Sequence, residues 1–121
     1  MPRIAIAVSD LIFASRIQAA VRALGYEALD ADTPAALRDA LAAAPEGAVV
    51  DLQDAAFDAL DAIRQAAAAG SRVLAFGRHT EPGILRDARE AGAAQAVSRS
   101  ELVEELPTLL RSLVEAGIGG G

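Results

Sequence analysis

The chain has 121 residues, which is long enough for one domain with a substantial core. Its formal net charge of −6 argues against nucleic-acid binding, because that function calls for a basic surface. The lack of cysteine excludes disulfides and zinc–thiolate sites, and all 11 basic residues are arginine. No apolar run has the length of a membrane span and no signal-peptide pattern is present, so we expect a cytoplasmic protein without membrane contact.

Five short runs, four of them strongly apolar, alternate with stretches of helical periodicity. The runs cover residues 3–8, 27–31, 48–50, 72–76 and 95–97. Strand alternating with helix predicts a parallel sheet with helices on both faces. Five such units predict an α/β, flavodoxin-like (βα)5 fold, a doubly wound parallel sheet in the order 2-1-3-4-5 with two helices on one face and three on the other.

The helical stretches carry recognisable start and stop signals. The expected helices cover 11–24, 35–44 after Thr33-Pro34, a third after Asp54 or Asp58, a fourth opened by Thr80-Glu81-Pro82, and a last one after Ser98. Pro107 interrupts the last pattern, so that segment is either broken into two helices or kinked. We expect a domain of residues 1–116 followed by a flexible glycine-rich tail at 117–121.

Polar residues follow the expected strands at one edge of the sheet. Ligand sites of open parallel sheets lie beyond the carboxyl ends of the strands. Those ends carry Ser9, Asp10, Asp51, Gly77, His79 and Arg99. Asp10 and Asp51 could hold Mg²⁺, which takes one or two carboxylates and keeps waters, or each could cap a helix or loop. His79 is either a proton-sensitive contact or a solvated loop residue.

Over essentially its whole length the chain resembles the receiver domain of bacterial response regulators. In that family an acidic pair after the first strand holds Mg²⁺, and an Asp at the end of the third strand accepts a phosphoryl group. The family also has a Ser or Thr at the end of the fourth strand and a Lys-Pro pair after the fifth. Asp51 matches the phosphoacceptor, and Ser9-Asp10 matches the acidic pair with a single carboxylate.

Two further positions depart from the family pattern. Gly77, or Arg78, stands where the hydroxyl is expected, and Arg99-Ser100 stands in place of Lys-Pro. Arginine does not substitute for the point-like ammonium of lysine. The resemblance therefore implies a degenerate, or pseudo-, receiver in which Asp51 is not phosphorylated efficiently.

We expect a stand-alone receiver-like signalling domain that binds a protein partner, such as a histidine kinase or an output protein. Nothing in the sequence indicates a catalytic triad or a phosphate-cradling glycine loop, so we do not expect an enzyme or a cofactor beyond Mg²⁺. Two alternatives stay open: a genuine Asp51 phosphoacceptor of a two-component system, and a small-ligand binder at the strand ends. Arg99 is expected to form an ion pair with Asp51 or Asp10 and to lower the pKa of that carboxyl group.

The last segment holds more apolar positions than one buried helix stripe needs. Four of them are the interface candidates Leu106, Leu109, Leu110 and Leu113. If they are exposed, they favour a homodimer or a partner complex through the fourth helix, fifth strand and last helix, the face that receivers commonly use. If the helix is broken at Pro107, the core absorbs both apolar stripes instead.

Overall fold

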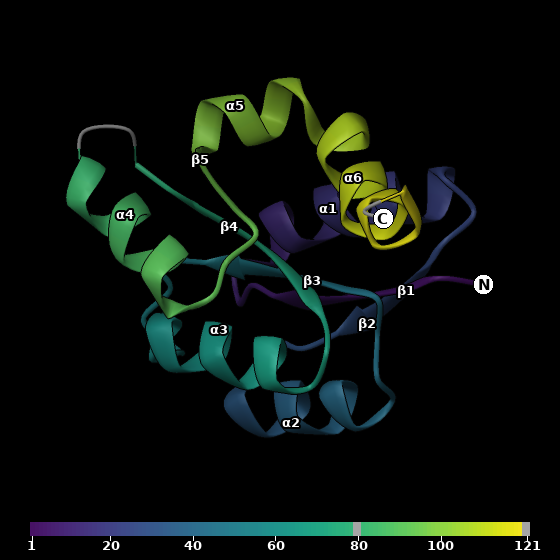
Figure 1. The fold of residues 1–121 in the computed structure, drawn as a ribbon, viewed down its shortest axis with the longest axis horizontal. Coiled ribbons are helices and arrows are strands. Elements are labelled where there is room, and N and C mark those ends of the chain that lie inside the picture. Colours follow the sequence, from purple (N-terminus) through teal and green to yellow (C-terminus); the bar gives the residue numbers. More distant parts are fainter. Residues whose placement is uncertain (79–80, 120–121) are drawn as a thin grey trace.

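A computed structural model describes residues 1–78 and 81–119 and places five parallel strands in one sheet (Figure 1). The strands are β1 (Arg3–Ala7), β2 (Glu27–Asp30), β3 (Gly47–Asp51), β4 (Arg72–Gly77) and β5 (Gln95–Ser98). Their order, β2-β1-β3-β4-β5, confirms the predicted doubly wound topology. The three inner strands are almost wholly buried, because helices cover both faces of the sheet.

In residues 1–78 and 81–119, six helices connect and follow the strands. They are α1 (Leu11–Ala23), α2 (Pro34–Ala42), α3 (Ala59–Ala68), α4 (Pro82–Ala91), α5 (Arg99–Glu104) and α6 (Leu106–Gly119). Four begin at a side chain that accepts a hydrogen bond from the backbone N–H three residues later, namely Asp10, Thr33, Asp58 and Ser98. The third helix therefore starts after Asp58 and not after Asp54, while Thr80 lies outside the described residues.

The core consists of two clusters, one on each face of the sheet. α2, α3 and α4 cover one face, where Leu37 and Ile63 are buried among alanines. α1, α5 and α6 cover the other face over Ile17, Phe76 and Leu110. Figure 1 shows α2 and α3 on one side of the sheet and α1, α5 and α6 on the opposite side. This is the expected division of two helices and three when α5 and α6 are counted as halves of one predicted helix.

The last helical segment is broken into two helices at Glu105. Pro107 lies in the first turn of α6, where a helix does not need the N–H that proline lacks. The break lets both halves turn their apolar side toward the sheet. The segment consequently buries Leu102, Leu106, Leu109, Leu110 and Leu113. The expectation that the last four form an exposed interface was therefore wrong, because they belong to the core.

The end of α6 overlaps the predicted tail. The helix continues through Gly119, well into the segment expected at 117–121, and residues 120–121 lie outside the described residues. Within residues 1–78 and 81–119, no helix is both long and apolar enough to cross a membrane.

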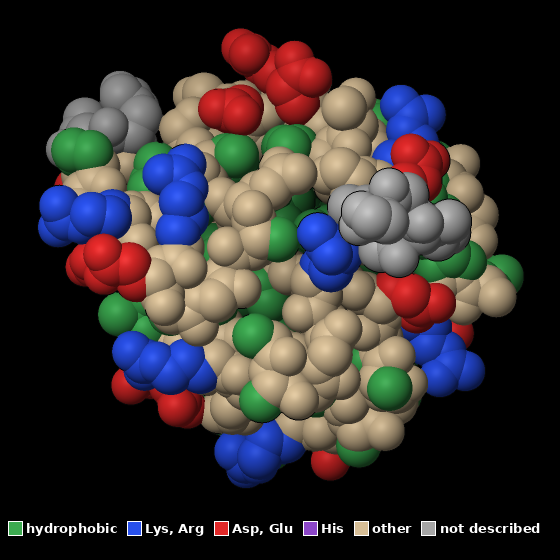
Figure 2. All heavy atoms as spheres, viewed as in Figure 1, with side chains coloured by type: hydrophobic (Ala, Val, Ile, Leu, Met, Phe, Trp, Pro, Cys, Tyr) green, Lys and Arg blue, Asp and Glu red, His purple; other side chains and the backbone are tan. Residues whose placement is uncertain are grey.

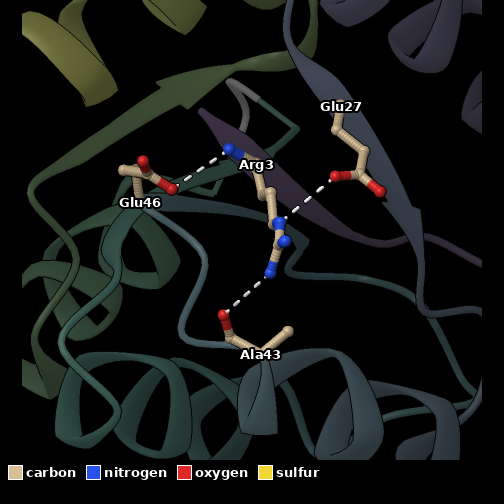
Figure 3. A network of polar contacts seen from close by, with 4 residues as sticks. All are labelled: Arg3, Glu27, Ala43 and Glu46. Atoms are coloured by element: carbon tan, nitrogen blue, oxygen red, sulfur yellow. Dashed lines mark hydrogen bonds and ion pairs between the residues drawn. The ribbon is translucent and has the colours of Figure 1, made fainter. Parts of the chain in front are cut away.

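A polar network around Arg3 closes the amino-terminal edge of the sheet (Figure 3). Its backbone N–H donates to Glu46 Oε1 at 3.1 Å, and its Nε donates to Glu27 Oε1 at 3.1 Å. Its guanidinium also reaches the carbonyl of Ala43 at 3.4 Å. This network ties β1 to β2 and to the segment before β3, so it stabilises the end of the sheet opposite the candidate site.

Candidate functional site

The carboxyl ends of the strands surround a cavity of about 280 Å³. It is lined by Ser9, Asp10, Asp51, Gln53, Asp54, Ala55, Phe76, Gly77, Arg78 and Arg99. The structure therefore brings together five of the six residues predicted for this edge. The sixth, His79, lies outside the described residues. Gln53 and Asp54, both in the loop after β3, are site residues that the sequence did not indicate.

Asp51 is the last residue of β3 and is only 8% exposed. Its Oδ1 accepts a hydrogen bond from the backbone N–H of Gln53 at 2.9 Å. Burial raises the pKa of Asp51, and the negative charges of Asp54 and Asp10 add to the rise. The Gln53 N–H and the positive charge of Arg99 act in the opposite direction but do not cancel it. The carboxylate thus lies where additional positive charge would stabilise it.

Asp10 is exposed at the start of α1. Its Oδ1 accepts the backbone N–H of Phe13 at 3.0 Å, so the helix-capping role weighed for this residue is confirmed. Asp10 also lines the cavity that contains Asp51. It therefore combines a structural hydrogen bond with a place in the candidate site.

Ser9 is held by Asp54 across the cavity. Its backbone N–H donates to Asp54 Oδ2 at 2.6 Å and its hydroxyl donates to Asp54 Oδ1 at 2.7 Å. Asp54 also accepts the N–H of Ala56 at 3.0 Å. Burial tends to raise the pKa of Asp54, but the hydrogen bonds from Ser9 and Ala56 outweigh it and hold the pKa below 3.8. The loop after β1 is thereby fastened to the loop after β3.

Arg99 lies against aromatic rings and not against a carboxylate. Its guanidinium carbon is 4.4 Å from the ring centroid of Phe13 and 6.0 Å from that of Phe76. The ion pairs within 4.0 Å in the described part of the chain do not include Arg99, so the predicted pair was wrong. A planar guanidinium packs well on an aromatic face, and this contact competes with the carboxylates. The charge of Arg99 nevertheless lowers the pKa of Asp51, as predicted, although burial raises that pKa overall.

Gly77 is buried at the end of β4 beside Gln53. A Cβ atom at this position would lie 3.4 Å from Leu52 Cδ1 and 3.6 Å from Gln53 Oε1. The side chain of Gln53 accepts the N–H of Arg78 at 2.8 Å and donates to Glu81 Oε1 at 3.3 Å. The place that the family pattern gives to a hydroxyl group is therefore next to a glutamine amide.

The two predicted metal ligands fit a magnesium ion only as a minimal site. Asp10 and Asp51 line the same cavity, and each uses Oδ1 in the hydrogen bonds given above. In residues 1–78 and 81–119, no group of three or more His, Cys, Asp or Glu side chains has an arrangement that could hold a metal ion. A cation here would depend on one or two carboxylates and on water, a mode that Mg²⁺ tolerates.

No protein-family model and no curated protein matches the sequence. Solved structures do match. The signal receiver domain of a DNA-binding response regulator from Colwellia psychrerythraea aligns with a TM-score of 0.82 at 20% identity, covering 95% of this chain and 99% of that one. A response regulator from Thermotoga maritima aligns with a TM-score of 0.81 at 14% identity, covering 95% and 98%.

A third matching structure contains a modified residue and bound groups. It is a response regulator protein from Burkholderia pseudomallei with a phosphorylated aspartic acid, a calcium ion and citrate. It aligns with a TM-score of 0.76 at 18% identity and covers 100% of this chain and 74% of that one. Together the three matches show that the chain has the receiver-domain fold.

Proposed function

We propose that this chain is a receiver-type signalling domain of a two-component system that acts by contacting a protein partner and in which Asp51 is a poor phosphoacceptor. The composition of the strand-end cavity carries this proposal. The fold supplies the position of an acceptor aspartate, whereas the groups around Asp51 differ from those that the family resemblance calls for.

Phosphoryl transfer depends almost entirely on positioned charges and hydrogen-bond donors. A phosphoryl group on Asp51 would bring further negative charge beside Asp10 and Asp54, which already raise the pKa of Asp51. The chain has no lysine to offset that charge, and Arg99 is stacked on Phe13. Gly77 has no hydroxyl group to bind the phosphoryl oxygens. These features together disfavour a stable phosphoaspartate.

The surface beside the cavity supports a role in protein contact. Leu11 and Ile12, in the first turn of α1 next to Asp10, are 76% and 86% exposed. Large apolar side chains exposed beside a polar cavity are typical of contact surfaces. A histidine kinase or an output protein is the class of partner that the receiver fold suggests.

The face of α4, β5 and α5 stays a proposed second contact or dimer surface, on different residues from those first expected. Val103 is 40% exposed, and three exposed carboxylates lie near it in the sequence, on α5 and just after it, namely Glu101, Glu104 and Glu105. Figure 2 shows acidic side chains gathered at the end of the molecule where α5 lies. This surface would suit a partner with basic residues around an apolar contact.

Two other functions have support from particular observations. A protein of the same fold carries a phosphorylated aspartic acid, which favours Asp51 as a genuine phosphoacceptor. The cavity of about 280 Å³, with charged groups of both signs, favours a small polar ligand. The phosphoacceptor function predicts modification of Asp51 without a protein partner. The ligand-binding function predicts saturable binding beside Asp51 without one.

A titration with beryllium fluoride and MgCl₂, a mimic of the phosphoryl group, separates the proposed function from that of a genuine phosphoacceptor. We expect no saturable change in the amide NMR signals of Asp51, Gly77 and Arg99, beyond the weak response that MgCl₂ alone produces. The variant Asp51→Asn serves as the control for non-specific effects. Stoichiometric, slow-exchange changes that disappear in Asp51→Asn would refute the proposal and favour the phosphoacceptor.

A photo-crosslinking experiment tests the protein-contact half of the proposal. A photoreactive residue at position 12, in cells that naturally produce the chain, should crosslink to one discrete protein. The same residue at position 64, which is exposed on α3 away from the cavity, is the matched control. Equal crosslinking from both positions, or none from position 12, would contradict a partner surface beside the cavity.

A further inference from the structure

One glutamine joins the aspartate at the end of β3 to the start of α4. Gln53 donates its backbone N–H to Asp51 Oδ1 at 2.9 Å. Its side-chain Oε1 accepts the backbone N–H of Arg78, and its Nε2 donates to Glu81 Oε1. We propose that Gln53 is a positioning residue that transmits a change at the Asp51 carboxylate to the start of α4.

The hydrogen bonds of Gln53, which we call the Gln53 bridge, join residues at the ends of regular elements. Asp51 accepts a hydrogen bond from the backbone of Gln53, so a change in the carboxylate acts on the main chain of the loop. Arg78 directly follows β4, and its N–H is a backbone donor. Glu81 is the N-cap residue of α4 but makes no side-chain cap hydrogen bond to that helix. Its carboxylate accepts a hydrogen bond from Gln53 instead, so the contacts of Gln53 reach the N-cap of α4.

The neighbouring glycine leaves room for this bridge. A Cβ at Gly77 would be in ordinary contact with Leu52 and Gln53, at 3.4 Å and 3.6 Å. Side-chain atoms beyond Cβ would compete for the space in which the Gln53 amide meets the N–H of Arg78. In this chain a glutamine amide therefore occupies the region between the two loops. The coupling goes beyond the proposed function, because it needs only a change in the state of the Asp51 carboxylate and not phosphorylation of Asp51.

A double-mutant experiment on the full chain tests the coupling by amide NMR. We would compare the wild type, Asp51→Asn, Gln53→Ala and the double variant. The shift changes caused by Asp51→Asn at Arg78, Glu81 and Ile84 should fall by about twofold or more when Gln53 is alanine. The changes at Ser9 and Phe13, on the other side of the cavity, should be the same in both backgrounds.

Two further variants distinguish coupling from simple loss of structure. Gln65→Ala removes a glutamine from α3, where it bonds Asp61, and should leave the effect of Asp51→Asn at Glu81 unchanged. Gln53→Glu keeps an acceptor for the Arg78 N–H but removes the donor to Glu81. It should preserve slow hydrogen exchange at Arg78 and lose the response at Glu81, whereas Gln53→Ala should speed exchange at Arg78 about fivefold.

The coupling is refuted if Asp51→Asn shifts the signals of Glu81 and Ile84 equally in the wild-type and Gln53→Ala backgrounds. This result would leave the protein-contact function untouched. Conversely, beryllium fluoride binding at Asp51 would refute the proposed function and leave the coupling through Gln53 in place.

Discussion

The two hydrogen bonds between Ser9 and Asp54 lead to the most specific prediction about the site. Ser9→Ala removes the hydroxyl that donates to Asp54 Oδ1 at 2.7 Å and keeps the backbone N–H that donates to Oδ2. Hydrogen bonds to charged groups contribute about 1.5–3 kcal/mol, and both residues are half-buried, so we expect a loss of about 1.5 kcal/mol. In a domain of this size that corresponds to a fall of roughly 6 °C in Tm.

Asp54→Ala should cost more, because it also removes the acceptor of two backbone N–H groups. Ser9 and Ala56 both donate their N–H to Asp54, so we expect a loss of about 2–4 kcal/mol. The double variant should be less unstable than the sum of the two, by about 1.5 kcal/mol, because one hydrogen bond is shared.

The pH dependence has a definite sign. The folded pKa of Asp54 lies below its ordinary value of 3.8, so its stabilisation is fully present well above pH 3.8. It is lost as the pH falls through the lowered pKa. The deficit of Ser9→Ala should therefore be largest near neutral pH and should shrink in acid.

Urea unfolding of the four proteins at pH 7 and pH 3, followed by circular dichroism, measures these quantities. Ser100→Ala, at an exposed serine on α5, is the matched control and should change stability by less than about 0.5 kcal/mol. The stabilising role of the Ser9–Asp54 hydrogen bond would be refuted if Ser9→Ala changed the free energy of unfolding as little as the control does. It would also be refuted if the effects of Ser9→Ala and Asp54→Ala were strictly additive.

Three further variants test the fold and the site. Asp51→Asn should stabilise the domain at neutral pH. The pKa of Asp51 in the folded state is raised above 3.8, so the ionised carboxylate destabilises the fold once the pH has risen through that pKa. A wild type more stable than Asp51→Asn to urea at pH 7 would contradict this. Gly47→Ala places a Cβ 2.9 Å from Ile4 Cδ1 and 3.1 Å from Leu113 Cβ, so it should lower the free energy of unfolding by about 1–3 kcal/mol. Gly83→Ala in α4 is the control and should raise it by up to ~1 kcal/mol. Equal Tm values for the two variants would refute the close approach at Gly47. Leu113→Ala should lower the free energy of unfolding by about 2–5 kcal/mol, because it truncates a core side chain. If light scattering instead shows a dimeric wild type and a folded, monomeric variant, Leu113 belongs to an interface.

The fold could be predicted because local signals and global topology agree. Apolar runs mark the strands, capping residues such as Thr33 and Ser98 mark helix starts, and parallel strands must end at one edge. That is enough to bring Asp10 and Asp51 to the same cavity. The leucines of the last segment were misjudged because their exposure depends on how the break near Pro107 turns each half toward the sheet.

The partners of the site residues were not predictable from sequence spacing. Arg99 meets Phe13 and Phe76, and these three residues belong to three different elements, so spacing alone cannot weigh their contact against an ion pair. Gln53 and Asp54 lie in a loop, where side-chain direction follows the local backbone and not a periodic pattern. The sequence signal that could indicate residues of this kind is a polar side chain two or three positions after an aspartate at the end of a strand.

The cavity contains Asp51, which we propose corresponds to the phosphoacceptor of receiver domains but is not phosphorylated efficiently. The most direct measurement is the intact mass of the protein after incubation with Mg²⁺ and acetyl phosphate, with Asp51→Asn treated in parallel. We expect the mass of the wild type to stay that of the unmodified chain. A stoichiometric gain of one phosphoryl group in the wild type, absent from Asp51→Asn, would contradict the account.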